Sequence, residues 1–234
     1  MKKLLGISAC IFLVLLGMPV FADYEVFVFQ EYDKTYTVSG DTLTVEMDLV
    51  LRNVGNTPVI PGEISFRTYE IDGGSTVPSE INEVLAQDNT GEIDSRVEES
   101  DEYSELIVHI WNPILPGFDH PISIEYEIDF SPSGILFNEV VFPIEETTIP
   151  IQDSSTEFLM PRRNSVTFAP DAEVTSDSLN TIVSWDRDRD LMLEYTILPL
   201  PRMPFRMVSV FWLSILMILG VVFIYLNSRR PDKR

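Results

Sequence analysis

The sequence has 234 residues, of which 45% are hydrophobic and 11% aromatic, a composition that fits a folded protein and excludes a disordered one. It is strongly acidic, with 16 Lys and Arg against 37 Asp and Glu and a formal net charge of −21 at pH 7. Because such a surface repels phosphate backbones, nucleic acid is excluded as a partner, whereas cations or a basic partner suit it. Solubility, or life in high salt, is the simplest reason for the charge.

The first 22 residues have the organisation of a signal peptide. Two lysines precede an apolar run over residues 4–20, which ends in Val20-Phe21-Ala22. Short side chains at the first and third of these last positions fit the signal-peptidase site, so we expect cleavage before Asp23. An uncleaved N-terminal anchor is the alternative. The only cysteine, Cys10, lies in this leader, so the mature domain has no disulfide.

Residues 23–131 are predicted to form an Ig-like antiparallel β-sandwich. Leu43–Leu51 and Ile122–Phe130 alternate apolar and polar side chains, which is the pattern of a strand with one buried face. Turn-forming sequences separate further candidate strands, a spacing typical of antiparallel sandwiches. Within residues 23–131 these candidates are Tyr24–Phe29, Ile64–Ile71 and Leu106–Trp111. Beyond them lie Leu136–Phe142, Ser165–Phe168, Thr181–Trp185 and Leu191–Leu198.

Helical periodicity is rare between the two apolar ends of the chain. Ser79–Gln87 is the one candidate, because Ile81, Val84 and Leu85 would share one side of a helix. We therefore expect one short helix within an all-β domain.

A boundary is expected near Ser131–Gly134, where turn residues gather. Residues 132–198 would then form a smaller second β subdomain, whose prolines confine its strands to edges or short lengths. Residues 199–206 contain three prolines and are predicted to be a semi-rigid extended stem.

Met207–Leu226 is a run of twenty uncharged residues that is predicted to cross a membrane. As a helix it would rise about 1.5 Å per residue and so match a hydrocarbon core of about 30 Å. The tail after it, residues 227–234, is basic and is expected to stay in the cytoplasm. The chain is thus predicted to be a single-pass type I protein of the cell membrane, with its bulk outside the cytoplasm. A buried core helix is the alternative.

Leu49–Pro58 carries a strand followed by an Asn-x-Gly turn, Asn53-Val54-Gly55. This stretch resembles the CARDB and related Ig-like ectodomain modules of archaeal and bacterial surfaces. Together with Pro113–Tyr126 and the C-terminal anchor, it is also similar to the luminal part of ribophorin I, the oligosaccharyltransferase subunit. Both resemblances imply a non-catalytic β-sandwich outside the membrane, and neither supplies catalytic residues.

The clearest metal-like pattern is formed by Asp186, Asp188 and Asp190, which alternate as the ligands of a calcium loop do. An EF-hand would require Gly and Glu at the positions that Leu191 and Ile197 occupy. We therefore favour a solvated hairpin loop, with weak calcium binding as the alternative. No other cofactor is expected.

Catalytic motifs are missing from the sequence. It contains no nucleophile elbow, no phosphate-binding glycine loop and no zinc-type pair of histidines. The chain is therefore predicted not to be an enzyme, although an active site built from carboxylates without a recognisable motif is left open.

Residues 111–118 form an apolar, proline-rich connection between two strands. We favour packing against the domain, because Trp and Phe are mostly buried in domains of this size. A partner-binding patch is the alternative. Its contact residues would be Trp111, Ile114, Leu115 and Phe118.

The sequence as a whole favours a non-catalytic, membrane-anchored interaction or scaffold domain outside the cytoplasm. A protein partner in the cell envelope is expected, with the chain as an accessory subunit of an envelope or membrane complex. A carbohydrate- or cation-binding surface domain for adhesion is the alternative.

Overall fold

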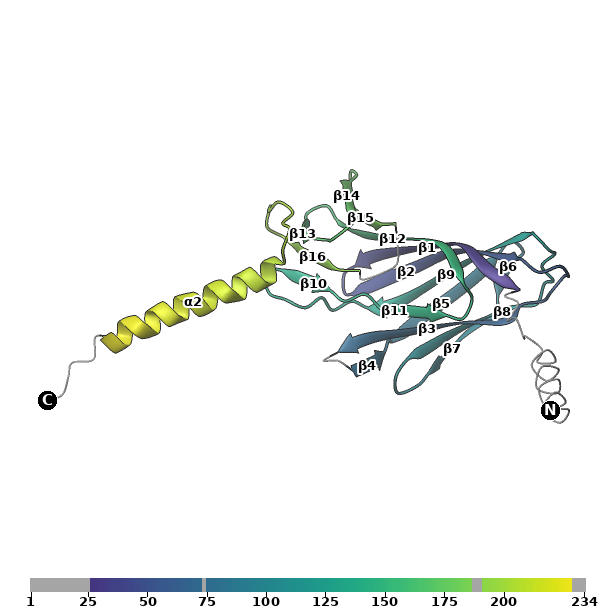
Figure 1. Cartoon of the computed structure of the whole chain (residues 1–234), viewed down its shortest axis with the longest axis horizontal. Coiled ribbons are helices and arrows are strands. Elements are labelled where there is room, and N and C mark those ends of the chain that lie inside the picture. Colours follow the sequence, from purple (N-terminus) through teal and green to yellow (C-terminus); the bar gives the residue numbers. More distant parts are fainter. Residues whose placement is uncertain (1–25, 73–74, 187–190, 229–234) are drawn as a thin grey trace, which may run out of the picture.

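The structure is a computed structural model that describes residues 26–72, 75–186 and 191–228. Within these residues the protein is built mostly of β-strands in several sheets, with one apolar helix at the C-terminal end (Figure 1). The prediction of a mostly β protein with a C-terminal helix is confirmed. The predicted signal peptide and residues 229–234 of the predicted tail lie outside the described residues.

The largest sheet has eight strands, drawn from nearly the whole β region of the chain. Neighbouring strands are antiparallel except for β1 and β12, which pair in parallel from Phe29 with Ile151 to Thr37 with Leu159. Across the sheet the order is β14 (Glu173–Ser176), β15 (Asn180–Trp185), β12 (Ile151–Pro161), β1 (Phe27–Ser39), β2 (Thr42–Asn53), β9 (Asp119–Asp129), β5 (Ile81–Asp88) and β6 (Gly91–Ile93).

Two smaller sheets complete the β body. A five-stranded sheet has the order β11 (Ile144–Thr147), β3 (Gly62–Asp72), β8 (Ser104–Ile110) and β7 (Ser95–Glu99), with β4 (Ser75–Pro78) also paired to β3. A three-stranded sheet has the order β10 (Asn138–Val140), β16 (Leu193–Thr196) and β13 (Ser165–Phe168).

The core lies between the eight-stranded and five-stranded sheets. On β2 every second residue from Leu43 to Leu51 is buried, as the period-two pattern predicted. Phe29 of β1 and Phe66 of β3 pack across the gap, with ring centroids 5.9 Å apart. Burying one such side chain is worth roughly 1.5–3 kcal/mol, so apolar burial holds the two sheets together.

The strand predicted at Tyr24–Phe29 continues as β1 to Ser39. Its register on β2 shifts just after Phe29, which marks a β-bulge. Beyond the shift Tyr32 and Lys34 occupy buried positions. The bulge interrupts the period-two alternation, and Lys34 occupies an inward position. The sequence pattern therefore predicts a strand that ends too early.

The prediction of a helix at Ser79–Gln87 is wrong, because Ile81–Asp88 form strand β5. The pairing of β5 with β9 shifts between Asn82 and Leu85, and Glu83 has a positive φ of 49°. This bulge lengthens the spacing between core-facing residues, Ile81 and Val84, from two to three positions. A spacing of three imitates helical periodicity.

The eight-stranded sheet crosses the boundary expected near Ser131–Gly134. Strands β12 and β15 come from the predicted second subdomain, yet β12 pairs with β1. Phe158 of β12 and Val183 of β15 belong to the same buried cluster as Phe29 and Leu43. Residues on the two sides of the expected boundary therefore share one sheet and one core.

Helix α2 (Met207–Ser228) projects from the end of the β body at which β10, β13 and β16 lie (Figure 1). Among the described residues, Met207–Tyr225 is the one helical stretch long and apolar enough to cross a membrane. None of that stretch is buried inside the protein. These properties support a membrane anchor.

Candidate functional site

Two loops meet at the end of the β body remote from α2 (Figure 1). Residues 54–61 connect β2 to β3, and residues 111–118 connect β8 to β9. They pair through Val59 and Ile114, whose backbone N–H groups each donate to the other residue's carbonyl oxygen, at 3.2 and 2.9 Å. We call these two loops together the distal tip.

Asn53, the last residue of β2, forms hydrogen bonds with both loops of the distal tip. Its side-chain nitrogen donates to the carbonyl oxygens of Thr57, at 2.9 Å, and Ile114, at 2.8 Å. Its side-chain oxygen accepts from the backbone nitrogen of Gly55 at 2.8 Å. The backbone N–H of Gly117, a residue with a φ of +75°, donates to the carbonyl oxygen of Asn53 at 2.8 Å. The buried amide is thus satisfied by both loops, which fixes their relative position.

The distal tip exposes large apolar side chains. Trp111 is 66% exposed and Phe118 62%, and Leu115 is also exposed. The packing expectation is therefore wrong for these three residues, which connect strands at an edge of the core rather than beneath a subdomain. It is confirmed for Ile114, which is only 4% exposed. Val54 and Ile60, which the sequence reasoning did not select, are exposed on the neighbouring loop.

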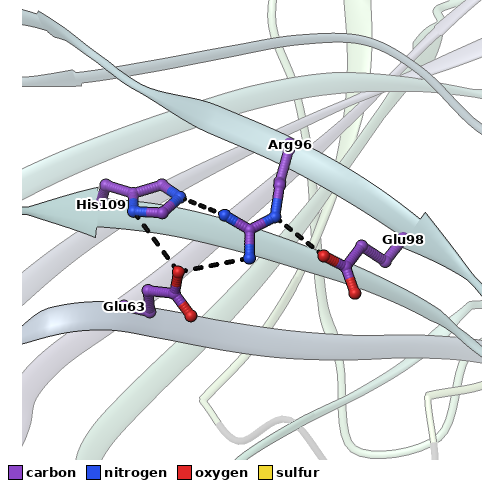
Figure 2. A network of polar contacts seen from close by, with 4 residues as sticks. All are labelled: Glu63, Arg96, Glu98 and His109. Atoms are coloured by element: carbon purple, nitrogen blue, oxygen red, sulfur yellow. Dashed lines mark hydrogen bonds and ion pairs between the residues drawn. The ribbon is translucent and has the colours of Figure 1, made fainter.

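Trp111 stacks on His109, with ring centroids 5.9 Å apart and 29° between the planes. Figure 2 shows the polar network that holds this histidine on the outer face of β3, β7 and β8. Nη1 of Arg96 lies 2.6 Å from Nε2 of His109, and its Nη2 donates to Glu63 at 3.2 Å. Its Nε donates to Glu98 at 2.9 Å.

The contact with Arg96 indicates which ring nitrogen of the histidine accepts a hydrogen bond. A guanidinium can only donate, so Nε2 of His109 must accept and its proton is on Nδ1, 3.8 Å from a Glu63 oxygen. The hydrogen bonds with Glu98 and Glu63 raise the pKa of Arg96. The imidazole that contacts Arg96 also stacks on the indole of Trp111.

The calcium pattern is only partly within the described residues. Asp186 is exposed just after β15, whereas Asp188 and Asp190 lie outside the described residues. Among the residues that the structure describes, no three His, Cys, Asp or Glu side chains form a group that could hold a metal ion. Calcium binding by these aspartates stays a prediction.

His120 and Asp119 are neighbours on β9 with different partners. His120 is buried and places Nε2 3.2 Å from Oδ2 of Asp88. Asp119 beside it pairs instead with Arg52, at 2.6 Å. Neighbouring strand residues face opposite sides of a sheet, so His120 and Asp119 cannot share a partner.

A second polar cluster lies in the core, beside a cavity of about 570 Å³. Glu145 of β11 accepts hydrogen bonds from the hydroxyls of Tyr126, at 2.6 Å, and Tyr32, at 3.2 Å, and lies 3.6 Å from Nζ of Lys34. Its carboxylate is therefore occupied by groups of β1 and β9. The cluster therefore ties the two sheets together.

No family model matches the chain. The uncharacterized protein MJ1395 of Methanocaldococcus jannaschii is 34% identical to it over 139 residues, which make up 59% of this chain and 98% of that protein. The chain belongs to the MJ1395 family. Because MJ1395 is itself described as uncharacterized, membership of the MJ1395 family adds no activity.

Among solved structures, this MJ1395-family chain is similar in fold to a candidate nutrient-binding protein from Legionella pneumophila. The TM-score is 0.51 at 9% identity, over 73% of this chain and 67% of that one. An M1 zinc metallopeptidase from Deinococcus radiodurans aligns at a TM-score of 0.44 and 14% identity, over 74% of this chain. The chain spans only 42% of that peptidase. The first likeness concerns the fold alone, and the second is too weak to carry an argument.

Proposed function

We propose that this protein is a non-catalytic, membrane-anchored interaction module that binds a protein partner through its distal tip. In this proposal the β body is an Ig-like ectodomain outside the cytoplasm, α2 is its single-pass anchor, and the chain is an accessory subunit of an envelope complex. The observation that carries the proposal is the exposure of Trp111 and Phe118 on a tip that hydrogen bonds hold in place. Exposed aromatic anchors on rigid supports are typical of interface hot spots.

The rigidity of the tip supports this role. Leu115 and Phe118 stand on a loop that Asn53 ties to its neighbour, and Trp111 rests on His109. Side chains that are already ordered lose little conformational entropy on binding, so their buried area contributes more to affinity. Apolar residues exposed without such a purpose would be an aggregation hazard.

The charge of the chain favours a basic partner. Acidic side chains outnumber basic ones by more than two to one. At the ends of the two loops, Asp119 pairs with Arg52 and Glu63 pairs with Arg96, so the local charges lie next to the apolar residues in sequence. A protein with an apolar socket framed by Lys and Arg would complement this surface and be steered towards it.

Site-specific photo-crosslinking in the native membrane tests the proposal. A benzophenone amino acid is placed at Phe118, with Leu179 as the matched control, because Leu179 is equally apolar and 75% exposed but lies on the β14–β15 turn. One stoichiometric protein adduct is expected from position 118 and none from position 179. The adduct should disappear when Trp111→Ser and Leu115→Ser are combined in the same chain.

The isolated partner then allows a direct measurement of affinity. Trp111→Ala is expected to weaken binding about tenfold or more, which corresponds to a hot-spot residue. Ile71→Ala, an exposed apolar residue on β3, should leave the affinity unchanged. Equal crosslinking from positions 118 and 179, or unchanged affinity of the Trp111 variant, would refute the proposal.

A further inference from the structure

The opposite end of the β body, where α2 begins, also exposes apolar side chains. Ile135 is 77% exposed and Ile197 68%, and Leu136, Leu198 and Phe205 are exposed as well. We call these five residues the base patch. They come from the loop before β10, the loop after β16 and the residue two positions before α2.

Hydrogen bonds and ring contacts join the base patch to the start of the membrane helix. The hydroxyl of Thr196 donates to the carbonyl oxygen of Leu136 at 2.6 Å, which brings the two loops together. Phe137, next to Leu136, packs on Phe211 of α2 with ring centroids 6.1 Å apart. The patch therefore lies beside the first turns of the helix (Figure 1).

The junction between the body and α2 is fixed. Glu194 of β16 is buried and its carboxylate accepts hydrogen bonds from the backbone nitrogens of Met207 and Val208, both at 2.9 Å. Arg206 forms an ion pair with Glu139 of β10. In the stem, the backbone nitrogen of Met203 donates to the carbonyl oxygen of Thr167 at 2.7 Å. These contacts keep the end of the β body next to the first residues of α2, and therefore close to the membrane when α2 is inserted.

We propose that the base patch is a lipid-contact surface that lies in the interfacial layer of the bilayer. The inference rests on α2 as a membrane anchor and is independent of the distal tip. Apolar side chains next to an inserted helix gain free energy by leaving water for the headgroup and acyl boundary.

The local charge agrees with contact to lipid. Residues 130–138 and 195–201, which supply four members of the patch, contain no charged side chain, although the chain is strongly acidic. Arg206, beside Phe205, is paired with Glu139, so this pair adds no net charge to the base. An acidic base would be repelled by anionic headgroups, whereas an uncharged one is not.

Spin labels measure the depth of the patch directly. In the full chain with Cys10→Ser, single variants Ile135→Cys and Ile197→Cys are labelled with a nitroxide in nanodiscs of neutral phosphatidylcholine. Leu179→Cys is the matched control, exposed and apolar but on the β14–β15 turn. Leu216→Cys in α2 reports the bilayer interior. Power saturation compares collisions with oxygen, which enters lipid, against collisions with a water-soluble nickel chelate.

The ratio of oxygen to nickel-chelate accessibility is expected to be several-fold higher at positions 135 and 197 than at 179, and to approach that at 216. Ratios at 135 and 197 equal to that at 179 would overturn the proposal, because the patch would then face water. Low accessibility to both reagents would also overturn it, since a second copy of the chain would then cover the patch. A label at 216 that faces water would remove the anchor on which the inference rests.

Discussion

Glu194 and Met207 are joined across the junction between the β body and α2. The carboxylate of Glu194, on β16, accepts a hydrogen bond from the backbone nitrogen of Met207, the first residue of the helix, at 2.9 Å. The first N–H groups of a helix have no partner within it, and the helix dipole favours a negative charge at this end. One buried carboxylate therefore satisfies the helix start and attaches it to the body.

Replacing this carboxylate should loosen the junction. Glu194→Ala leaves the nitrogens of Met207 and Val208 without their acceptor, so the free energy of unfolding should fall by about 1–2 kcal/mol. Pulsed-EPR distances between a label on β2 and one on α2 should broaden in nanodiscs. Glu194→Gln keeps one acceptor oxygen, so its stability and its distance distribution should lie between those of the wild type and Glu194→Ala. Glu173→Gln, exposed on β14, is the control, and equal broadening in it would contradict the assignment.

Asn53 is expected to be the most sensitive residue of the distal tip. Asn53→Ala removes the side-chain partner of the Thr57 carbonyl and of the Gly55 nitrogen and one of the two donors to the Ile114 carbonyl, and should cost about 2–3 kcal/mol of unfolding free energy. Asn53→Asp keeps the acceptor but loses both donors, so it should also destabilise. Chemical denaturation measures both variants. Asn56→Ala, exposed on the same loop, should change stability by less than about 0.5 kcal/mol.

The buried carboxylate of Glu145 is expected to contribute far more to the free energy of unfolding than the exposed carboxylate of Glu146. Glu145→Leu removes an acceptor from Tyr32 and Tyr126 and a counter-charge from buried Lys34, which should cost roughly 3 kcal/mol or more. Glu146→Leu is the matched control, since Glu146 bonds the hydroxyl of Tyr69 at an exposed site. That variant should lose at most about 1 kcal/mol. Similar losses in the two variants would show that the cluster does not tie the sheets.

The raised pKa of Tyr126 predicts how the free energy of unfolding changes at alkaline pH. Burial, followed by the nearby Glu145 carboxylate, raises the pKa of Tyr126 well above its usual value of 10.0. The folded protein thus keeps the phenol protonated while the unfolded chain ionises, so stability is full below about pH 10 and falls as the pH rises above it.

Denaturation midpoints between pH 8 and pH 11 check this sign. Tyr126→Phe should be less stable than the wild type at pH 8, because the bond to Glu145 is lost, but its stability should fall less between pH 8 and pH 11. Parallel pH curves for the two proteins would contradict the predicted link between Tyr126 ionisation and unfolding.

Local patterns in the sequence are sufficient to predict the mostly β fold and the apolar C-terminal helix. Period-two alternation such as that of Leu43–Leu51 predicts strands, because a half-buried strand needs one apolar face. A run of apolar residues from Met207 predicts the helix, because its length matches a bilayer. The acidic composition predicts partners other than nucleic acid, because the surface repels phosphate. Each of these properties is local or additive along the chain.

Features that depend on contacts between distant segments are not predictable from these local patterns. Bulges in β1 and β5 changed the inward spacing, so the strand to Ser39 was missed and a helix was expected at Ser79–Gln87. The exposure of Trp111 beside buried Ile114 follows from the pairing of two loops, which no local pattern records. Likewise, Glu194 caps a helix that begins thirteen residues later, because folding brings β16 to the start of α2.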